Sequence, residues 1–504
     1  VMKPERLPVF TSLGGISLLA GTVIAASAFA LTRLPSLRGP GVSSFLAYFL
    51  IAALAYSTAV LRLKRDHIHI AMVWLFAILF RVPLLLTIPS LSDDVFRYIW
   101  DGHLLNLGVN PYALPVNAAL LDQYTTPLRA LVNNNWMASP YMPFAQIYFW
   151  FINRIAPQNP LGFQAGALLL DLGTGWLVMD MLDRLGAPRR RVLVYLWHPL
   201  VILEFTHAAH IDALMIFFIM GAFWFIVRGN PGDSWGFKRL YLSAASLAAA
   251  TLTKLIPILL VPVLCRRWKW PRLVLYLALI ITIGAVFSLN AGWGLRGPLD
   301  GMGLFGAVRI YTRYWNFNSG VYHWLEVLIS GYQTPGAVPA DIAGGTPGNL
   351  ARSISGLVII LAAVITAVWS WKLDDPGKYS FEKRNLFLLR ISFFPLGAFL
   401  LFTTTVHPWY VTLFVPFLAF LLPVRNETGA ISRFIWPWIY FSCAVALSYT
   451  TYLDICNLRE YYLIRKLEYT PFYVLLLWGG WPHFRHWAAL LLKRSAQQAS
   501  SKRT

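Results

Sequence analysis

The sequence is poor in charged residues. Asp, Glu, Lys and Arg make up only 13% of its 504 residues, whereas a soluble protein of this size contains roughly 25%. Hydrophobic residues make up 57% of the chain, and its mean hydropathy is +0.57. This composition excludes an ordinary soluble domain, and it predicts an all-α, polytopic membrane protein.

Cysteine, acidic residues and nucleotide-binding motifs are also scarce or missing. Three cysteines are too few for a disulfide framework, and the sequence has no Walker A motif and no GxGxxG after a strand. The 22 acidic residues are outnumbered by 42 lysines and arginines, which gives a net charge of +20. The cations form short clusters between apolar runs rather than a patch with interleaved aromatic residues, so we expect no nucleic-acid partner.

Apolar runs recur along the chain at close to the ~20 residues that cross the hydrocarbon of a bilayer. The first run is long and lacks a clear small-residue cleavage site, so we expect no cleavable signal peptide. Pro257 and Pro262 interrupt two short runs, which predicts a broken or re-entrant pair of segments there. We expect about 14 transmembrane helices, over residues 9–31, 42–61, 68–88, 162–184, 190–206, 211–228, 239–254, 255–267, 271–290, 351–371, 386–404, 409–424, 433–450 and 471–491.

The basic clusters predict which side each loop occupies. The cations gather in 61–67, 184–191, 265–270, 423–433 and the C-terminal tail. The positive-inside rule then places these loops and both termini in the cytoplasm. The long loops would form an extracytoplasmic layer on a single transmembrane domain, residues 1–504, of the plasma (inner) membrane; these loops are 89–161, 291–350 and 451–470.

Paired acids stand at the start of the first long outer loop. Asp93 and Asp94 follow directly on an apolar run, in the sequence SLSDDVFRYIWDG. Residues 94–107 have helical spacing and predict an amphipathic helix at the membrane surface, and 142–156 predict a second one.

Two interpretations of the paired acids remain open. In the structural one, Ser92 caps the helix and Arg97 forms ion pairs with both Asp93 and Asp101. In the functional one, Asp93 or Asp94 accepts a proton from a sugar hydroxyl, or the two hold a divalent cation such as Mg or Mn.

Polar and aromatic residues gather in three other outer segments. In FTHAAHIDALM, His207 and His210 are spaced for one helical face, where they could bind a metal or cap a tight turn. The same segment contains Glu204 and Asp212, which we expect in a polar outer cavity. The second segment contains arginines, which bind phosphate through paired hydrogen bonds. The third segment contains aromatic residues that anchor at an interface or contact a sugar. These residues are Arg309, Arg313 and Trp315 in the second segment, and His407, Trp409 and Tyr410 in the third.

Two charged residues interrupt apolar runs. Lys254 precedes a proline-containing segment, where it either extends to the interface or faces a lipid-linked phosphate. Asp171 lies inside a predicted span, so we expect it to face the bundle interior and find a polar partner in a structural contact.

Four segments carry a resemblance to a known family. SDDVFRYIWDGHLLNLGVNPY, PLVILEFTHAAHIDALM, LTKLIPILLVP and TVHPWY resemble the GT-C superfamily of integral-membrane glycosyltransferases. The likeness covers about residues 68–480 and is strongest to bacterial polyprenyl-phosphate-mannose-dependent mannosyltransferases. In that family an acidic residue of the first large outer loop is the catalytic base, a role that falls here on Asp93 or Asp94. The family's acidic loop often follows its first span, whereas here it follows the third; two additional spans keep it on the same side.

The resemblance implies a hexosyltransferase that works outside the membrane. It would move one hexose, with mannose as the expected sugar, from a polyprenyl-phosphate donor to a lipid-linked glycan or glycolipid, inverting the configuration at C1. Arg309, Arg313 and Lys254 would bind the donor phosphate. The sugar and acceptor would be bound by His407, Trp409, Tyr410, Trp315, His210, Glu204 and Asp212.

Some points stay open at this stage. Some members of the family use a divalent ion and others do not, so a metal at Asp93 and Asp94 is undecided. A flippase or transporter for lipid-linked oligosaccharides, and an outer-face glycan polymerase or ligase, are the alternative functions. Transport is the first of these alternatives, but the sequence shows neither an internal repeat nor a charged path at the midplane beyond Asp171.

Overall fold

The computed structural model describes residues 15–65, 67–229, 234–296, 300–330, 349–423, 430–454 and 458–480. Over these ranges the regular structure is helical, apart from isolated β-bridges such as the one that joins Phe317 to Thr405. The predicted all-α class is therefore confirmed for the described part of the chain.

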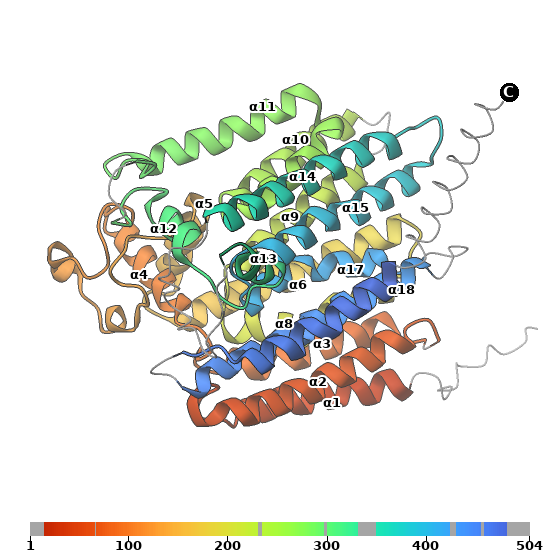
Figure 1. The fold of residues 1–504 in the computed structure, drawn as a ribbon, viewed down its shortest axis with the longest axis horizontal. Coiled ribbons are helices and arrows are strands. Elements are labelled where there is room, and N and C mark those ends of the chain that lie inside the picture. The colour runs from red at the N-terminus through yellow and green to blue at the C-terminus, as the bar shows by residue number, and fades with distance from the viewer. Residues whose placement is uncertain are drawn as a thin grey trace, which may run out of the picture.

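The longer helices lie side by side in one bundle (Figure 1). Neighbours in the bundle include α1 with α2, α9 with α10, and α14 with α15. A further helix occupies 462–480. The bundle helices are α1 (Gly15–Leu31), α2 (Val42–Arg62), α3 (Ile70–Leu85), α6 (Pro160–Arg184), α9 (Asp212–Arg228), α10 (Ser234–Thr251), α11 (Val261–Ser288), α14 (Asn349–Leu373), α15 (Phe381–Phe402), α17 (Val415–Leu421) and α18 (Ala430–Ala444).

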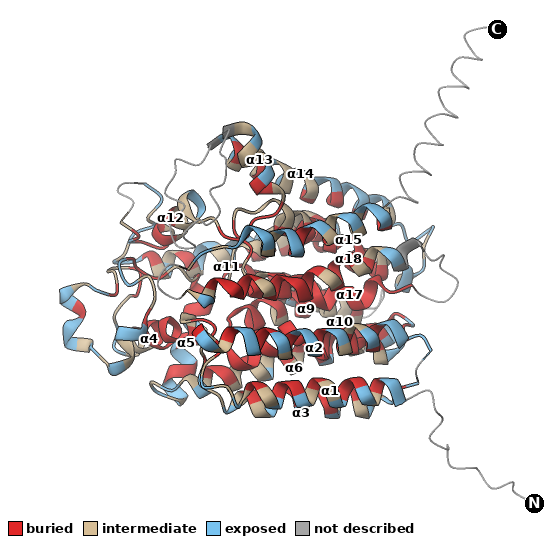
Figure 2. Cartoon of the chain, turned by 60° about the horizontal axis from the view of Figure 1, so that its bottom comes forward, coloured by how far each residue is buried: buried red, intermediate tan, exposed pale blue. Residues whose placement is uncertain are grey.

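The apolar surface of the bundle is what a membrane protein needs. Large apolar side chains such as Leu54 and Leu361 are exposed on the outer helices, while the red, buried positions in Figure 2 fill the interior. Lipid tails are as apolar as these side chains, so exposure to them has no hydrophobic cost. The chain is a membrane protein.

Fewer helices than expected are long and apolar enough to cross a bilayer unaided. The described residues contain five such helices, or six if one bent pair counts as a span, so the count of about 14 is not confirmed. The difference arises because several predicted runs form helices of only 10–17 residues, such as Gly15–Leu31, Ile70–Leu85 and Pro408–Leu421. The ends of the predicted spans 9–31 and 471–491 lie outside the described residues.

The chain is broken and sharply bent where the spans 190–206 and 211–228 were predicted. Here the chain forms short pieces: η4 (Arg189–Val192), α7 (Leu193–Leu196), α8 (Pro199–Ile202) and a π-helical turn, η5 (Leu203–His207). The axis then bends by 119° before α9 begins. At the bend, Ala209 has a left-handed φ of 56°. The bend brings the polar residues of this segment to one end of the bundle.

The break predicted around Lys254 is present. Helix α10 ends at Thr251, and a 3₁₀ turn, η6 (Ile256–Leu260), leads into α11. Helix α11 itself leaves helical geometry at Lys269, where φ is 54°. Lys254 therefore lies in a turn between two apolar helices rather than inside one.

A layer of short helices covers one end of the bundle (Figure 1). It contains α4 (Asp94–Asn106), α5 (Pro143–Ile155) and α12 (Gly306–Tyr314). Two more short helices, α13 (Val321–Ser330) and α16 (Pro408–Val411), lie close in the sequence to the aromatic segments around Trp315 and His407. Helices are thus present where 94–107 and 142–156 predicted them, while their place at the membrane surface stays a prediction. Side chains of α4 and α5, with those of the loop between them, form a second hydrophobic core. At Gly102 a Cβ would lie 2.4 Å from the Phe149 carbonyl oxygen, so glycine permits the two helices to approach.

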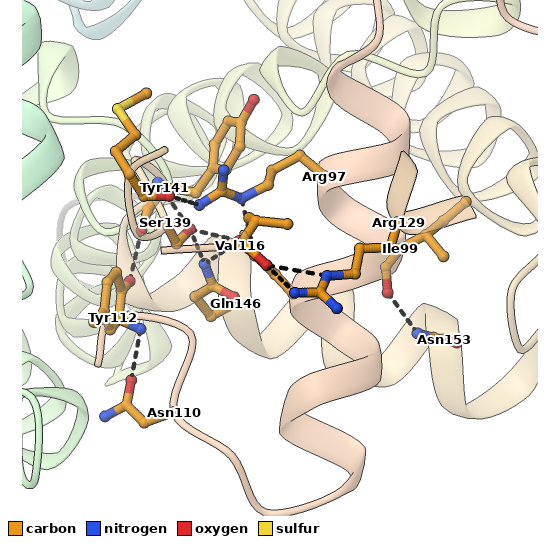
Figure 3. Close-up of polar contacts among 12 residues, drawn as sticks. Arg97, Ile99, Asn110, Tyr112, Val116, Arg129, Ser139, Tyr141, Gln146 and Asn153 are labelled. Atoms are coloured by element: carbon orange, nitrogen blue, oxygen red, sulfur yellow. Dashed lines mark hydrogen bonds and ion pairs between the residues drawn. The ribbon is translucent and has the colours of Figure 1, made fainter. Parts of the chain in front are cut away.

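A buried polar network fixes the loop between α4 and α5 (Figure 3). The Asp101 carboxylate accepts hydrogen bonds from Arg97 Nε at 3.1 Å and from Gln146 Nε2 at 3.0 Å, and Ser139 donates to it as well. Arg97 also donates to the Met137 carbonyl. The predicted Arg97–Asp101 pair is confirmed. The Arg97–Asp93 pair is wrong, because Asp93 lies at the N-cap position and binds another arginine.

A second buried ion pair lies inside the bundle. Arg81 Nε of α3 lies 2.6 Å from Asp171 Oδ2 of α6, and both side chains are inaccessible to solvent. Arg81 also donates to the carbonyl of Leu196. The partner expected for Asp171 is therefore Arg81, and the contact joins α3, α6 and α7.

Replacing Arg81 with Met should lower the free energy of unfolding by about 3–5 kcal/mol, because Asp171 would stay buried without its cation. The double variant R81M/D171L should recover much of this loss. Denaturant unfolding of the purified protein in one detergent measures both. R184M is the matched control, because the Arg184 side chain is 36% exposed beside Asp180 and its loss should cost at most about 1 kcal/mol. Equal stability of R81M and R184M would contradict this account.

Candidate active site

The two paired aspartates have different partners. Asp93 lies at the N-cap of α4, and both of its carboxylate oxygens accept from Arg38 Nη1, at 2.9 and 3.0 Å. Arg38 comes from the loop between α1 and α2, and its guanidinium also lies over the Tyr452 ring at 4.6 Å. The Asp93 carboxylate is therefore neutralised by a cation from a distant segment.

Asp94 occupies the first turn of α4 and has no such cation. Its Oδ1 accepts from Asn133 Nδ2 at 2.9 Å, and its Oδ2 lies 3.8 Å from His210 Nδ1. The Ser92 hydroxyl accepts from the Asp94 backbone N–H. Within the described ranges neither lysine nor arginine forms an ion pair with Asp94, whose side chain is 18% exposed. It is a partly accessible carboxylate that keeps capacity to accept a proton.

Four aromatic rings form a continuous stack beside Asp94. His210 stacks on Trp409 at 4.2 Å between ring centroids, Trp409 on His407 at 4.4 Å, and His407 on Phe317 at 4.7 Å. Both faces of the Trp409 indole are thus covered by imidazoles. A sugar cannot stack on that ring, so Trp409 can contribute only its edge to a binding site.

Glu204 lies on the far side of His210 from Asp94. Its Oε2 is 3.3 Å from His210 Nε2, and its Oε1 accepts from the Tyr449 hydroxyl at 2.7 Å. Glu204 and His210 are both fully buried. The imidazole is thus held between two carboxylates and against the face of an indole.

Lys254 forms the cationic part of the cluster. Its Nζ lies 2.6 Å from Asp212 Oδ2 and 4.7 Å from the centre of the Tyr410 ring. The Tyr410 hydroxyl is 2.6 Å from that of Tyr311, which stacks on Trp315. The lysine side chain keeps 16% of its surface exposed, so an anion could still reach its ammonium group.

Comparison with known proteins agrees with the family resemblance. The family model for the N-terminal domain of alpha-(1->6)-mannopyranosyltransferases matches residues 9–270. This range includes Asp93, Asp94, His210 and Lys254. The chain belongs to this family. It is a mannosyltransferase of the GT-C type.

Curated relatives of this mannosyltransferase carry the same activity in their names. Alpha-(1->6)-mannopyranosyltransferase A of Mycobacterium tuberculosis is 24% identical over 409 residues, which cover 74% of this chain and 73% of the relative. A probable alpha-(1->6)-mannopyranosyltransferase of Mycolicibacterium smegmatis is 23% identical over 71% of this chain and 65% of the relative. The Corynebacterium glutamicum alpha-(1->6)-mannopyranosyltransferase A is 26% identical over 145 residues, 27% of this chain and 28% of the relative. No solved structure matches the chain.

The two arginines predicted for the donor phosphate lie on α12. Arg309 donates to the Gly294 carbonyl at 3.0 Å. Arg313 is exposed, with its guanidinium over the neighbouring Tyr314 ring. These contacts do not join either arginine to Lys254, so their role in this mannosyltransferase stays a prediction.

The two histidines of the FTHAAHIDALM segment do not face a common site. His207 Nδ1 lies 2.7 Å from the Thr87 hydroxyl, and its Nε2 accepts from the Ser90 N–H. This places His207 against the connection between α3 and α4, whereas His210 faces Asp94. In the described part of the chain, no group of three or more His, Cys, Asp or Glu side chains is arranged to hold a metal ion.

Several residues that contact the paired aspartates or Glu204 could not be recognised as site residues from the sequence. Arg38, Asn133 and Tyr449 lie in segments that contain none of the motifs, and each reaches the site only through the fold. Tyr311 and Phe317 belong to the aromatic segment around Trp315, which did mark the region but not these positions.

Burial sets the protonation state of His407, which precedes α16 in the loop after α15. Desolvation by the surrounding rings is the largest effect and lowers the pKa of the imidazole to about 3. The charge of Asp94 acts in the opposite direction, while Lys254 and His210 lower the pKa further. Since this pKa is far below neutrality, the ring is uncharged between pH 5 and 8 and does not titrate there.

Replacing His407 with Gln should therefore lower the rate of mannosyl transfer, by loosening the ring stack, without changing the shape of its pH profile between pH 5 and 8. Initial rates of the purified enzyme across that range measure the effect. H103Q is the matched control, because His103 contacts the Tyr124 carbonyl in the outer layer. Loss of an inflection in H407Q alone would contradict a neutral His407.

Proposed function

We propose that this mannosyltransferase moves one mannosyl unit from polyprenyl-phosphate mannose to a hydroxyl of a lipid-linked glycan or glycolipid, with inversion at C1. The names of the relatives specify an alpha-(1->6) linkage, so the proposed nucleophile is the 6-hydroxyl of an acceptor mannose. Because family membership makes the chain an enzyme, transport is no longer an alternative. The single observation that carries the proposal is the accessible, cation-free Asp94 between His210 and Asn133.

Asp94 is the proposed general base. As the acceptor oxygen attacks C1, the O–H bond breaks and its proton passes to the Asp94 carboxylate, while the bonding pair of the C1–O bond leaves with the phosphate. Asp93 is less suited to this step, because the Arg38 guanidinium donates hydrogen bonds to both of its oxygens. These contacts support Asp94 rather than Asp93 as the proposed base.

Lys254 is the proposed partner of the leaving phosphate. Asp212 and the Tyr410 ring fix the position of its ammonium group, which still has N–H donors for a second anion. A cation held in place before the reaction stabilises charge that develops on the leaving group without reorganising. The turn that contains Lys254 joins α10 to η6 and α11, and we propose that the polyprenyl chain lies against these apolar helices.

The proposed active side is the extracytoplasmic one. The Arg38–Asp93 contact joins the α1–α2 loop to the layer that contains α4, so the basic end of α2 at Arg62 lies at the opposite end of the bundle. Helix α6 likewise begins beside α5, because Gly162 in its first turn lies so close to Ala156, just after α5, that a Cβ would contact it. The other end of α6 is at Arg184. Cation-rich loops at the end away from Asp94 agree with a cytoplasmic location for that end.

Replacing Asp94 with Asn should reduce kcat by ~10² or more, because it removes the proton acceptor. D93N is the matched control at the adjacent position, and it should keep most of the activity. Mass spectrometry of products formed from synthetic polyprenyl-phosphate mannose and a mannoside acceptor gives both rates. A deeper loss in D93N than in D94N, with both proteins folded, would contradict the assignment.

Replacing Lys254 with Met should raise the KM for the polyprenyl-phosphate donor and lower kcat, while K254R should retain part of the activity. Since K254M leaves Asp212 buried without a cation, the double variant K254M/D212N tests the same loss without that penalty. Steady-state kinetics with the donor varied at a fixed acceptor concentration measure the change. An unchanged donor KM in the folded double variant would remove Lys254 from the donor site.

A further inference from the structure

Two buried ionisable side chains of the site, Glu204 and His210, have no role in the proposed transfer step. Both are 0% exposed. Within the described residues, Glu204 Oε2 and both ring nitrogens of His210 have no aligned hydrogen-bond partner, and no lysine or arginine forms an ion pair with Glu204. Buried polar atoms are nearly always hydrogen-bonded. A role in proton transfer would explain why these exceptions lie next to the proposed base.

An irregular backbone brings these two side chains together. The π-helical turn η5 contains Glu204, and the left-handed φ of 56° at Ala209 follows it. The His210 N–H then donates to the Glu204 carbonyl at 3.0 Å. In a straight α-helix, residues at this spacing would face different sides, because each residue turns the helix by about 100°. Single π turns and strained backbone positions are frequent at functional sites.

The Trp409 indole fixes the plane of the His210 ring. The two rings are 4.2 Å apart between centroids and are inclined by only 16°. In this orientation Nε2 lies 3.3 Å from Glu204 Oε2, and Nδ1 lies 3.8 Å from Asp94 Oδ2. Asp94, His210 and Glu204 therefore lie in a row. Catalytic hydrogen bonds are often long or poorly aligned before the substrates bind, and they shorten in the complex.

The number of protons in this row determines which contacts are favourable. A neutral imidazole has one N–H donor and one acceptor nitrogen, so it can donate to only one of the two carboxylates. We assign the proton to Nε2, at the shorter contact with Glu204. Nδ1 then presents its lone pair to Asp94, which agrees with the longer distance there. When Asp94 takes the proton of the acceptor hydroxyl, its new O–H group can donate to Nδ1.

Glu204 is suited to receive a proton at the end of the row. Its charge is buried, and its partners are the Tyr449 hydroxyl and the His210 ring. A buried carboxylate without a cation is costly, whereas the neutral carboxylic acid is much less so. Asp94 differs, because its side chain is 18% exposed and water can solvate its charge. Moving a proton from Asp94 to Glu204 therefore removes the buried charge and restores the accessible one.

We propose that His210 and Glu204 form a relay that takes over the proton accepted by Asp94. The Asp94 Oδ2–H bond breaks as Nδ1–H forms, and the Nε2–H bond breaks as Glu204 Oε2–H forms. Asp94 is again a carboxylate, His210 stays neutral and Glu204 becomes a neutral acid. After the products leave, the same steps in reverse return the proton through Asp94 to water. Both residues act through Asp94 and are positioning residues. The relay rests on the proposed function and adds the path of the proton.

The test is a double-mutant cycle between Glu204→Gln and Asp94→Asn. Gln keeps the shape of the side chain but cannot take up the proton. H210Q replaces E204Q in the cycle if E204Q does not fold. H207Q is the matched control, a buried histidine of the same segment that contacts Thr87 and Ser90 instead of Asp94. Mass spectrometry of the products formed by each purified full-length protein in nanodiscs, from polyprenyl-phosphate mannose and a mannoside acceptor, gives kcat and both KM values.

We expect E204Q and H210Q to lower kcat about tenfold, the size of a coupling between contacting residues, with both KM values within about twofold of wild type. In the D94N background, E204Q should change the rate by less than about twofold, because the residue through which it acts is absent. H207Q should leave kcat unchanged.

Two results would overturn the relay while the proposed base stands. These are a wild-type kcat in both E204Q and H210Q, and a tenfold loss that E204Q also causes in the D94N background, since a structural role gives the same loss in both. D94N with the wild-type rate would instead refute Asp94 as the base, and the relay with it.

Discussion

A carboxylate that is taken out of water needs a partner, and for several aspartates of this bundle that partner is a cation. Asp171 is paired with Arg81, Asp101 with Arg97, Asp212 with Lys254 and Asp93 with Arg38. Asp94 differs from these four, since in the described part of the chain it has an amide and an imidazole as partners but no lysine or arginine. Because no lysine or arginine occupies its oxygens, Asp94 is the aspartate that we propose as the base.

The ring stack gives the site its rigidity. Its members come from three segments far apart in the sequence: His210 before α9, Phe317 after α12, and His407 and Trp409 at the start of α16. Stacked aromatic rings are stiff and contribute beyond the area that they bury. The stack therefore fixes the distance between Asp94 and the segments that carry Lys254 and Trp315.

Local patterns in the sequence predicted much of this arrangement, because they depend on neighbouring residues. The spacing of Val95, Ile99 and Leu104 predicted α4, and the ionisable Asp171 predicted a buried partner. Sequence alone could not choose between Asp93 and Asp94, since the choice depends on Arg38, which is 55 residues away from Asp93. The sequence analysis also predicted Trp409 in the sugar site, whereas the His210 and His407 rings cover both faces of its indole. The predicted number of transmembrane helices is not confirmed, because bends such as the one at Ala209 and short helices divide the apolar runs. Hydropathy indicates that a segment is apolar, but it does not indicate the path of the backbone.

The account depends on where the donor binds relative to Asp94. The most direct measurement is an experimental structure of the full chain with a non-hydrolysable polyprenyl-phosphonate mannose. We predict that the phosphonate contacts Lys254 and that C1 of the mannose lies between Lys254 and Asp94. A phosphonate bound at Arg309 and Arg313 with C1 remote from Asp94, or one bound at the Arg62 end of the bundle, would contradict it.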